Sequence, residues 1–186
     1  MKKENSNTKR IVLTGVFAAL VFVSNYLSIP IPVTIGSISR IHLGNGLCIL
    51  SGLFLGPVAG GLAAGIGSGL YDLLSPIYIT SAPFTFVFKF LLAAIPGLIL
   101  HKLKKPESVN VKIIIGGILG QIVYIVLYLS KSFIEGLLQG SAAGALVPTI
   151  ITKLITSSTN AVIAIIISVT LYKVIKKVLD KNNINT

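Results

Sequence analysis

Long apolar segments alternate with short polar or proline-containing stretches along the chain, and this alternation restricts the fold more than any other feature. A bilayer core ~30 Å thick requires about 20 apolar residues of helix, and fewer where neighbouring helices shield the segment. Only 11% of the 186 residues are charged, against roughly 25% in soluble domains, and the mean hydropathy is +0.90. The chain is therefore predicted to be an all-α integral membrane protein with a single domain.

Six segments are predicted to be transmembrane helices, at about residues 11–28, 43–55, 57–74, 84–101, 111–129 and 149–175. The apolar run from about residue 43 to residue 74 is too long for one span. Gly56-Pro57 divides it, because proline breaks a helix interior but suits the first turn of a new helix. SIPIPVTIGSISR is interpreted as an outer loop, and SKSFIEGLLQGSAAGALVP as a long outer loop with a short amphipathic or re-entrant piece. No cleavable signal peptide is expected.

Basic residues are concentrated on one side of this arrangement. Twelve of the 16 Lys and Arg residues precede the first span, lie between the fourth and fifth, or follow the sixth: Lys2, Lys3, Lys9, Arg10, Lys102, Lys104, Lys105, Lys112, Lys173, Lys176, Lys177 and Lys181. Because cytoplasmic loops carry an excess of basic residues, both termini are predicted to be cytoplasmic. The net charge of +11 is thus assigned to helix flanks and not to nucleic-acid binding.

Sequence motifs of catalysis are absent. The chain contains no phosphate-binding loop, no H-E-x-x-H and no G-x-S-x-G, so an intrinsic ATPase is excluded and no enzyme is expected. His42 and His101 are predicted at opposite ends of the membrane and cannot share a metal ion. The single cysteine, Cys48, excludes an intrachain disulfide. No cofactor is expected.

Small residues form one face of two predicted helices. Faces of this kind allow helix backbones to approach closely within a membrane. The first span carries Gly15, Ala18 and Ala19, which would serve either internal packing or docking of another membrane protein. In the third span, internal packing is expected for the residues at positions i, i+4 and i+8, which are Gly61, Gly65 and Gly69.

Polar residues within the predicted spans are few, and each is costly in hydrocarbon, so they indicate a functional site. Asp72 and Lys89 lie at similar depth and are predicted to form an ion pair. Other candidates lie on one face of the fifth span (Gln121, Tyr124, Tyr128), on one face of the sixth (Lys153, Ser157, Asn160) and at the start of the second (Arg40, His42, Asn45). Together they predict a site, in the outer half of the bundle, for a small, polar, ring-shaped ligand.

The sequence resembles the substrate-binding S component of energy-coupling factor (ECF) vitamin transporters. The resemblance includes the chain length, the six predicted spans, the small-residue face on the first helix, and the block from Ile41 to Gly97. Within that block, HLGNGLCILSGLFLGPVAGGLAAGIGSGLYDLL is followed by SAPFTFVFKFLLAAIPG. The style is most similar to the branch for hydroxymethylpyrimidine and vitamin B6-type compounds.

This resemblance implies a ligand site near the outer face, under the first, third and fifth loops. It implies a complex with a transmembrane coupling protein and two cytoplasmic ATPases, in the plasma membrane of a bacterium. It also implies that the small-residue face of Gly15, Ala18 and Ala19 contacts the coupling protein, with Gly15 replacing the first alanine of the family's motif.

The leading hypothesis is therefore a high-affinity capture subunit for a water-soluble vitamin or precursor, with hydroxymethylpyrimidine or a pyridoxine-like compound as the expected substrate. Asp72 and Lys89 are expected to orient the ligand or to hold their helices around it. The alternative is a self-sufficient secondary carrier or channel that acts as an oligomer. A structural membrane protein without a ligand is disfavoured, because pure packing does not require a buried polar cluster. The expected partners are the vitamin, membrane lipid and the ECF module, with no nucleic acid.

Overall fold

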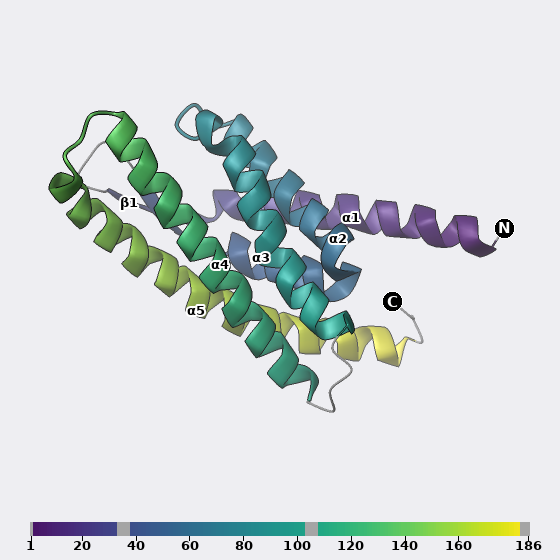
Figure 1. Ribbon diagram of the computed structural model, residues 1–186. Coiled ribbons are helices and arrows are strands. Elements are labelled where there is room, and N and C mark those ends of the chain that lie inside the picture. The colour runs from purple at the N-terminus through teal and green to yellow at the C-terminus, as the bar shows by residue number, and fades with distance from the viewer. Residues whose placement is uncertain (1, 33–37, 103–107, 183–186) are drawn as a thin grey trace.

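A computed structural model describes residues 2–32, 38–102 and 108–182. Within these ranges the protein is a bundle of long helices with a two-stranded sheet at one end (Figure 1). The elements in chain order are α1 (Lys2–Tyr26), β1 (Ser28–Pro32), β2 (Ile38–His42), α2 (Gly44–Leu73), the short 3₁₀ helix η1 (Ile79–Ser81), α3 (Ala82–Lys102), α4 (Val109–Leu138) and α5 (Ala143–Lys181). Lys104 and Lys105 of the second basic group lie outside the described residues.

Helix α2 reverses its direction at Gly56, where the sequence predicts a break. Gly56 has φ 79° and ψ 178°, a conformation that is essentially restricted to glycine. The Ser51 hydroxyl donates a hydrogen bond to the Gly60 carbonyl across 2.9 Å, although residues nine apart in a straight helix are separated by about 13 Å. The two halves, 44–55 and 57–73, therefore lie side by side as a helical hairpin.

The small residues of the second half of α2 pack against α3, as the sequence predicts. A Cβ atom on Gly61 would lie 2.8 Å from the Phe90 ring, and one on Gly65 would lie 2.9 Å from the Phe86 carbonyl oxygen. Gly69 faces the same side chain, Phe86, at ordinary contact distance. These glycines therefore allow α3 to approach closely enough for its phenylalanine side chains to cover the α2 backbone.

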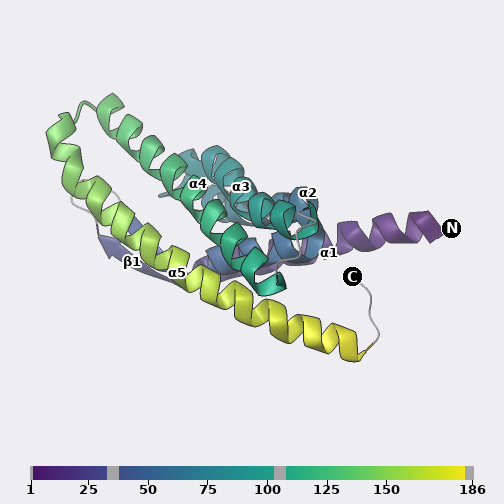
Figure 2. The same ribbon diagram turned by 60° about the horizontal axis from the view of Figure 1, so that its bottom comes forward.

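The segment predicted as the first outer loop forms an antiparallel hairpin instead. Strand β1 pairs with β2 so that Ser28 is opposite His42 and Pro30 is opposite Arg40. Proline lacks an N–H group, which suits an edge strand of a small sheet. The sheet lies beside the N-terminal part of α5, on which β2 packs (Figure 2).

Helices α4 and α5 are longer than predicted. Helix α4 continues nine residues beyond the predicted end at residue 129, to Leu138, so much of the segment interpreted as a loop is helical. Helix α5 begins at Ala143 and ends at Lys181. The prediction failed there because Ser130, Lys131 and Ser132 were interpreted as the end of a membrane span, whereas polar residues are compatible with a helix that extends beyond the bilayer core.

Both termini lie at the same end of the bundle as the last residues of α3 and the first residues of α4 (Figure 1). The opposite end contains β1 and the connection between α4 and α5. Within the described residues, four helices are long and apolar enough to cross a membrane: 7–26, 44–73, 79–102 and 109–138. Helix α5 is not among these four.

Two side chains form hydrogen bonds with backbone carbonyl groups at the point where α2 reverses. Arg10 of α1 donates from Nη2 to the Leu55 carbonyl oxygen across 3.3 Å, and His101 Nε2 of α3 lies 2.8 Å from the Leu53 carbonyl oxygen. The last carbonyls of a helix have no partner within it. These contacts therefore satisfy the end of the first half and join the hairpin to α1 and α3.

Candidate functional site

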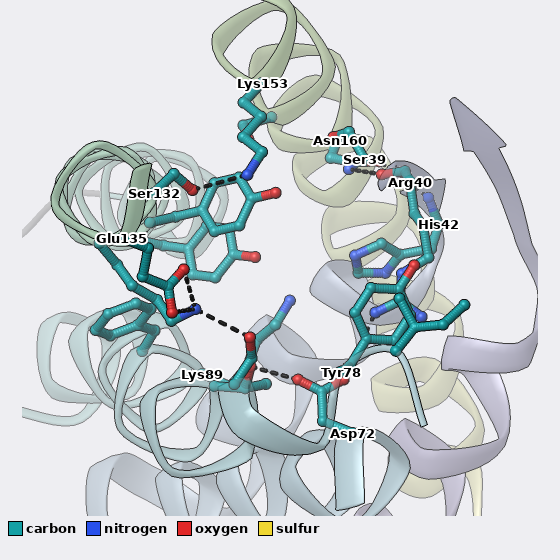
Figure 3. Close-up of a pocket in the computed structure, with 18 of the residues that line it drawn as sticks. Ser39, Arg40, His42, Asp72, Tyr78, Lys89, Ser132, Glu135, Lys153 and Asn160 are labelled. Carbon is teal, nitrogen blue, oxygen red and sulfur yellow. Dashed lines mark hydrogen bonds and ion pairs between the residues drawn. The ribbon is translucent and has the colours of Figure 1, made fainter. Parts of the chain in front are cut away.

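A cavity of about 270 Å³ lies near β2 and the end of α4, at the end of the bundle opposite the termini (Figure 1). Figure 3 shows this cavity in close-up. Its walls come from the end of α1, β2, the end of α2, the η1 segment, α3, α4 and α5. Nine of the eleven residues that the sequence predicts for the site line it: Arg40, His42, Asp72, Lys89, Tyr124, Tyr128, Lys153, Ser157 and Asn160. The fold therefore brings together residues from five separate predicted segments.

Asp72 pairs with Arg40 and not, as predicted, with Lys89. Arg40 Nη2 lies 3.6 Å from Asp72 Oδ1, and the Thr85 hydroxyl donates to Asp72 Oδ2 across 2.5 Å. The prediction was wrong because Arg40 was placed in a loop, and only the β-hairpin brings it over the end of α2.

Two aromatic rings hold the Arg40 guanidinium in place. Its central carbon lies 4.6 Å from the centroid of the Tyr71 ring and 4.2 Å from that of Tyr78. A guanidinium is attracted to the faces of aromatic rings. The Nη1 atom of Arg40 is buried and has no hydrogen-bond partner among the described residues, so one donor of this fixed group remains available at the cavity.

Lys89 lies on the floor of the cavity. Beneath it are Asn45 and Gln121, the two predicted site residues that do not line the cavity. Its ammonium group donates to the side-chain oxygen of Asn45, and Asn45 Nδ2 donates to Gln121 Oε1 across 3.4 Å. The ammonium nitrogen lies 4.4 Å from the centroid of the Tyr124 ring. Asn45 and Gln121 are therefore placed to orient Lys89 and not to contact a ligand in the cavity.

Lys153 enters the cavity from the opposite side, on α5 (Figure 3). It donates to the Ser132 hydroxyl across 3.1 Å and lies 5.6 Å from the centroid of the Tyr128 ring. The rings of Tyr124 and Tyr128 are parallel within 3°, with centroids 5.9 Å apart. Helix α4 thus presents two stacked tyrosines, each next to a lysine from another helix.

Asn160 connects α5 to β2. Its Nδ2 donates to the Arg40 carbonyl across 2.7 Å, and its Oδ1 accepts from the His42 N–H across 3.0 Å. The side chain therefore completes both hydrogen bonds with the backbone of the strand that carries Arg40 and His42. Ser39 Oγ, on the same strand, lies 2.6 Å from Thr156 Oγ1 of α5.

His42 precedes α2 and is buried next to two cations. Its Nδ1 accepts a hydrogen bond from the Gly44 N–H across 3.1 Å. Burial, together with the positive charges of Lys89 and Arg40, lowers the pKa of His42 well below its ordinary value. The ring is therefore neutral at physiological pH. The described residues contain no group of three or more His, Cys, Asp or Glu side chains that could hold a metal ion.

Several residues of the cavity were missed by sequence reasoning. Lys131 donates to the Ser81 hydroxyl across 2.9 Å and pairs with Glu135 at 2.7 Å. Both follow Tyr124 and Tyr128 at helical spacing, so extending the periodicity of the fifth span past residue 129 would have found them. Ser132 and Gln139 follow Tyr128 and Glu135 at the same spacing. The other missed lining residues carry no comparable signal in the sequence: Asn25, Ser39, Ile77, Tyr78, Thr80, Ser81, Thr85 and Phe88.

The predicted docking face on α1 is divided by the structure. Gly15 and Ala19 are exposed on the outside of the bundle, and a Cβ atom on Gly15 would meet nothing within 4 Å. Ala18 is half-buried and packs against the cluster of Leu55, Ala59 and Ala63 in α2. Ala18 therefore serves the internal α1–α2 contact, and the outward face consists of Gly15 and Ala19 with apolar neighbours.

Comparison with known proteins identifies a matching family model and similar solved structures. The family model described as "ECF-type riboflavin transporter, S component" matches residues 5–177. A solved structure described as "Structure and mechanism of the S component of a bacterial ECF transporter" is similar in fold, with a TM-score of 0.66 and 22% sequence identity over 93% of this chain and 98% of that chain. No curated protein matches. The resemblance to S components is confirmed, whereas the hydroxymethylpyrimidine and B6-type branch stays a prediction.

Proposed function

Because this chain belongs to the family described as ECF-type riboflavin transporter S components, we propose that it captures a water-soluble, ring-shaped vitamin or vitamin precursor in the cavity at the end of the bundle opposite its termini. Proteins of this family are the substrate-binding subunits of ECF vitamin transporters and not enzymes. They are multi-pass proteins of the bacterial plasma membrane and work with an ECF module of a transmembrane protein and ATPases.

The composition of the cavity wall carries this proposal. It combines aromatic rings, from Tyr78, Phe88, Tyr124 and Tyr128, with buried hydrogen-bond donors. Ligand sites are typically concave, with aromatic walls and a few oriented polar groups, and enclose about 300–1,000 Å³. A ring-shaped compound with polar substituents can stack on the aromatic rings and accept hydrogen bonds from the buried donors. The candidate substrates are hydroxymethylpyrimidine or a pyridoxine-like compound, from the sequence style, and riboflavin, from the description of the family.

The proposal includes six spans with both termini in the cytoplasm. The two halves of α2 count as separate spans, α5 is the sixth, and the three basic groups then face the cytoplasm. Single cysteines at positions 3, 105 and 181 test this in intact cells, because the native Cys48 is fully buried. We expect no reaction with an impermeant reagent added outside, and labelling of position 105 would refute the topology.

Docking to the transmembrane coupling protein is proposed for the exposed face of Gly15 and Ala19. Both residues are small and exposed on α1, so a second helix can approach the backbone of α1 there. Ala18 is left out of this face because it packs on α2.

Two measurements test the function. Native mass spectrometry of the protein purified in mild detergent should identify a co-purified ring compound. Uptake of that compound into liposomes should require the coupling protein, the ATPases and ATP. Uptake by the purified chain alone with an ion gradient would instead support the secondary carrier.

A further inference from the structure

The charges that line the cavity do not balance. Among the described residues, four cationic side chains face two carboxylates: Arg40, Lys89, Lys131 and Lys153 against Asp72 and Glu135. His42 adds no charge, because its pKa is lowered by burial and by its cationic neighbours. The cavity therefore carries an excess of positive charge when it is empty.

Both carboxylates are already engaged. Asp72 accepts from Thr85 across 2.5 Å and lies 3.6 Å from Arg40. Glu135 lies 2.7 Å from Lys131, one turn away on the same helix. Neither carboxylate forms an ion pair with Lys89 or Lys153 in the described part of the chain.

Lys89 and Lys153 have only neutral acceptors. Lys89 donates to Asn45 and is 3% exposed, and Lys153 donates to Ser132 and is 9% exposed. Their ammonium groups point into the cavity from opposite sides (Figure 3). A tyrosine face attracts each of them, but it does not neutralise the charge. Buried cations without a counter-ion are destabilising, so this arrangement favours an anion between the two lysines.

The polar groups at the cavity that remain available for hydrogen bonding are donors, which also favours an anionic ligand. Arg40 Nη1 at the wall is a buried donor without a partner, and each ammonium group has three N–H donors. A carboxylate or phosphate accepts several charge-assisted hydrogen bonds at once. A neutral ring would leave these cations unbalanced.

We infer that the substrate carries an anionic oxygen group, a carboxylate or a phosphate, attached to its ring, and that Lys89 and Lys153 bind this group together. This inference rests on the proposed function and narrows its substrate class to phosphorylated or carboxylated ring compounds. Arg40 contributes the remaining donor from β2.

Matched pairs of ligands that differ in one anionic group test the inference. We would measure binding to the full chain in nanodiscs by calorimetry for riboflavin 5′-phosphate and riboflavin, hydroxymethylpyrimidine phosphate and hydroxymethylpyrimidine, and nicotinate and nicotinamide. The anionic member of at least one pair should bind about tenfold tighter or more. The first two pairs test a phosphate, and the third tests a carboxylate.

Two variants connect this preference to the lysines. Lys153→Gln should reduce the preference about tenfold or more, and Lys89→Gln should do the same if the variant folds. The matched control is the double variant Lys176→Gln with Asp180→Asn, which removes an exposed charge pair of α5 outside the cavity without changing the net charge. It should keep the preference for the anion.

The outcomes separate the two proposals. If the neutral member binds as tightly as the anionic one in every pair that binds, or if Lys153→Gln leaves the preference intact, the charge inference is wrong and the capture function stands. If no compound of the panel binds and none co-purifies, both proposals fail.

Discussion

The guanidinium of Arg40 lies 3.6 Å from the carboxylate of Asp72, and this contact joins the β-hairpin to the end of α2. The Arg40 side chain is 16% exposed and that of Asp72 is 5% exposed. The pair is therefore largely shielded from water, and removing one partner leaves a charge without compensation. The position of β2 over the cavity depends on this contact and on Asn160.

A double-mutant cycle tests the pair. Asp72→Asn and Arg40→Gln should each destabilise the protein, and the double variant should lose less than the sum, with a coupling energy of about 0.5–3 kcal/mol. Thermal unfolding in detergent measures each value. Asp72→Asn combined with Lys89→Met is the control, and a larger coupling there would show that Lys89, and not Arg40, is the partner of Asp72.

Asn160→Ala should loosen β2. Both side-chain hydrogen bonds of Asn160 go to the backbone of Arg40 and His42, and their loss should cost about 1–3 kcal/mol. Hydrogen exchange in residues 38–42 should rise, and ligand affinity should fall with it. Asn160→Asp is the matched variant, because it keeps the acceptor for the His42 N–H. Unchanged exchange in Asn160→Ala would contradict this role.

Gly56→Ala should destabilise the hairpin of α2. A side chain at φ 79° and ψ 178° is strained, at a cost of about 1–3 kcal/mol. The control is Gly15→Ala, where a Cβ atom meets open space on a helix and should be neutral or slightly stabilising. Equal unfolding temperatures for the two variants would show that the strain is absorbed elsewhere.

Ala19→Leu should abolish uptake by the complete transporter but leave ligand binding to the isolated chain unchanged. Ala19 is exposed on the outside of the bundle on α1, so a bulky side chain would separate α1 from its partner. Ala145→Leu on α5, which is also exposed, is the matched control. Full uptake with Ala19→Leu would exclude this face as the docking surface.

The stability of the protein should fall as the pH drops below about 6.5, the ordinary value for histidine. Because the pKa of His42 is lowered in the folded state, the unfolded chain binds the proton first, and the folded state loses stability until the pH reaches the lowered value. Above about 6.5, His42 is neutral in both states and has no such effect. Unfolding temperatures at about pH 7.5 and about pH 5 should differ less in His42→Gln than in the wild-type chain.

Much of the site was accessible from the sequence because buried polar residues in a membrane helix have few explanations. Lys89, Tyr124, Lys153 and Asn160 were identified by their depth and their helical spacing, and all four line the cavity. The periodicity of a helix fixes which residues share a face. Helical periodicity therefore predicted which residues of α4 and α5 face the cavity, without any knowledge of contacts between distant segments.

The errors arose where the site depends on contacts between distant segments. No periodicity indicates that residues 28–32 and 38–42 form a hairpin, because two prolines suggest a loop. Without that hairpin, nothing in the sequence brought Arg40 to the end of α2, and Asp72 was paired with Lys89 because the two lie at similar predicted depth. Lys131 and Glu135 were missed for a different reason. The end of the fifth span was predicted from where the apolar residues stop, whereas α4 continues past that point to Leu138.

The reversal at Gly56 has a consequence for how the chain enters the membrane. The first half of α2, residues 44–55, has a rise of only about 18 Å, well short of the ~30 Å hydrocarbon core. It contains Asn45 and Ser51, both fully buried. Such a segment is poorly suited to partition into lipid by itself, so we expect it to enter the membrane together with residues 57–73. The unit of biogenesis in this part of the chain would then be the pair of helices, which keeps Asn45 and Ser51 away from lipid tails.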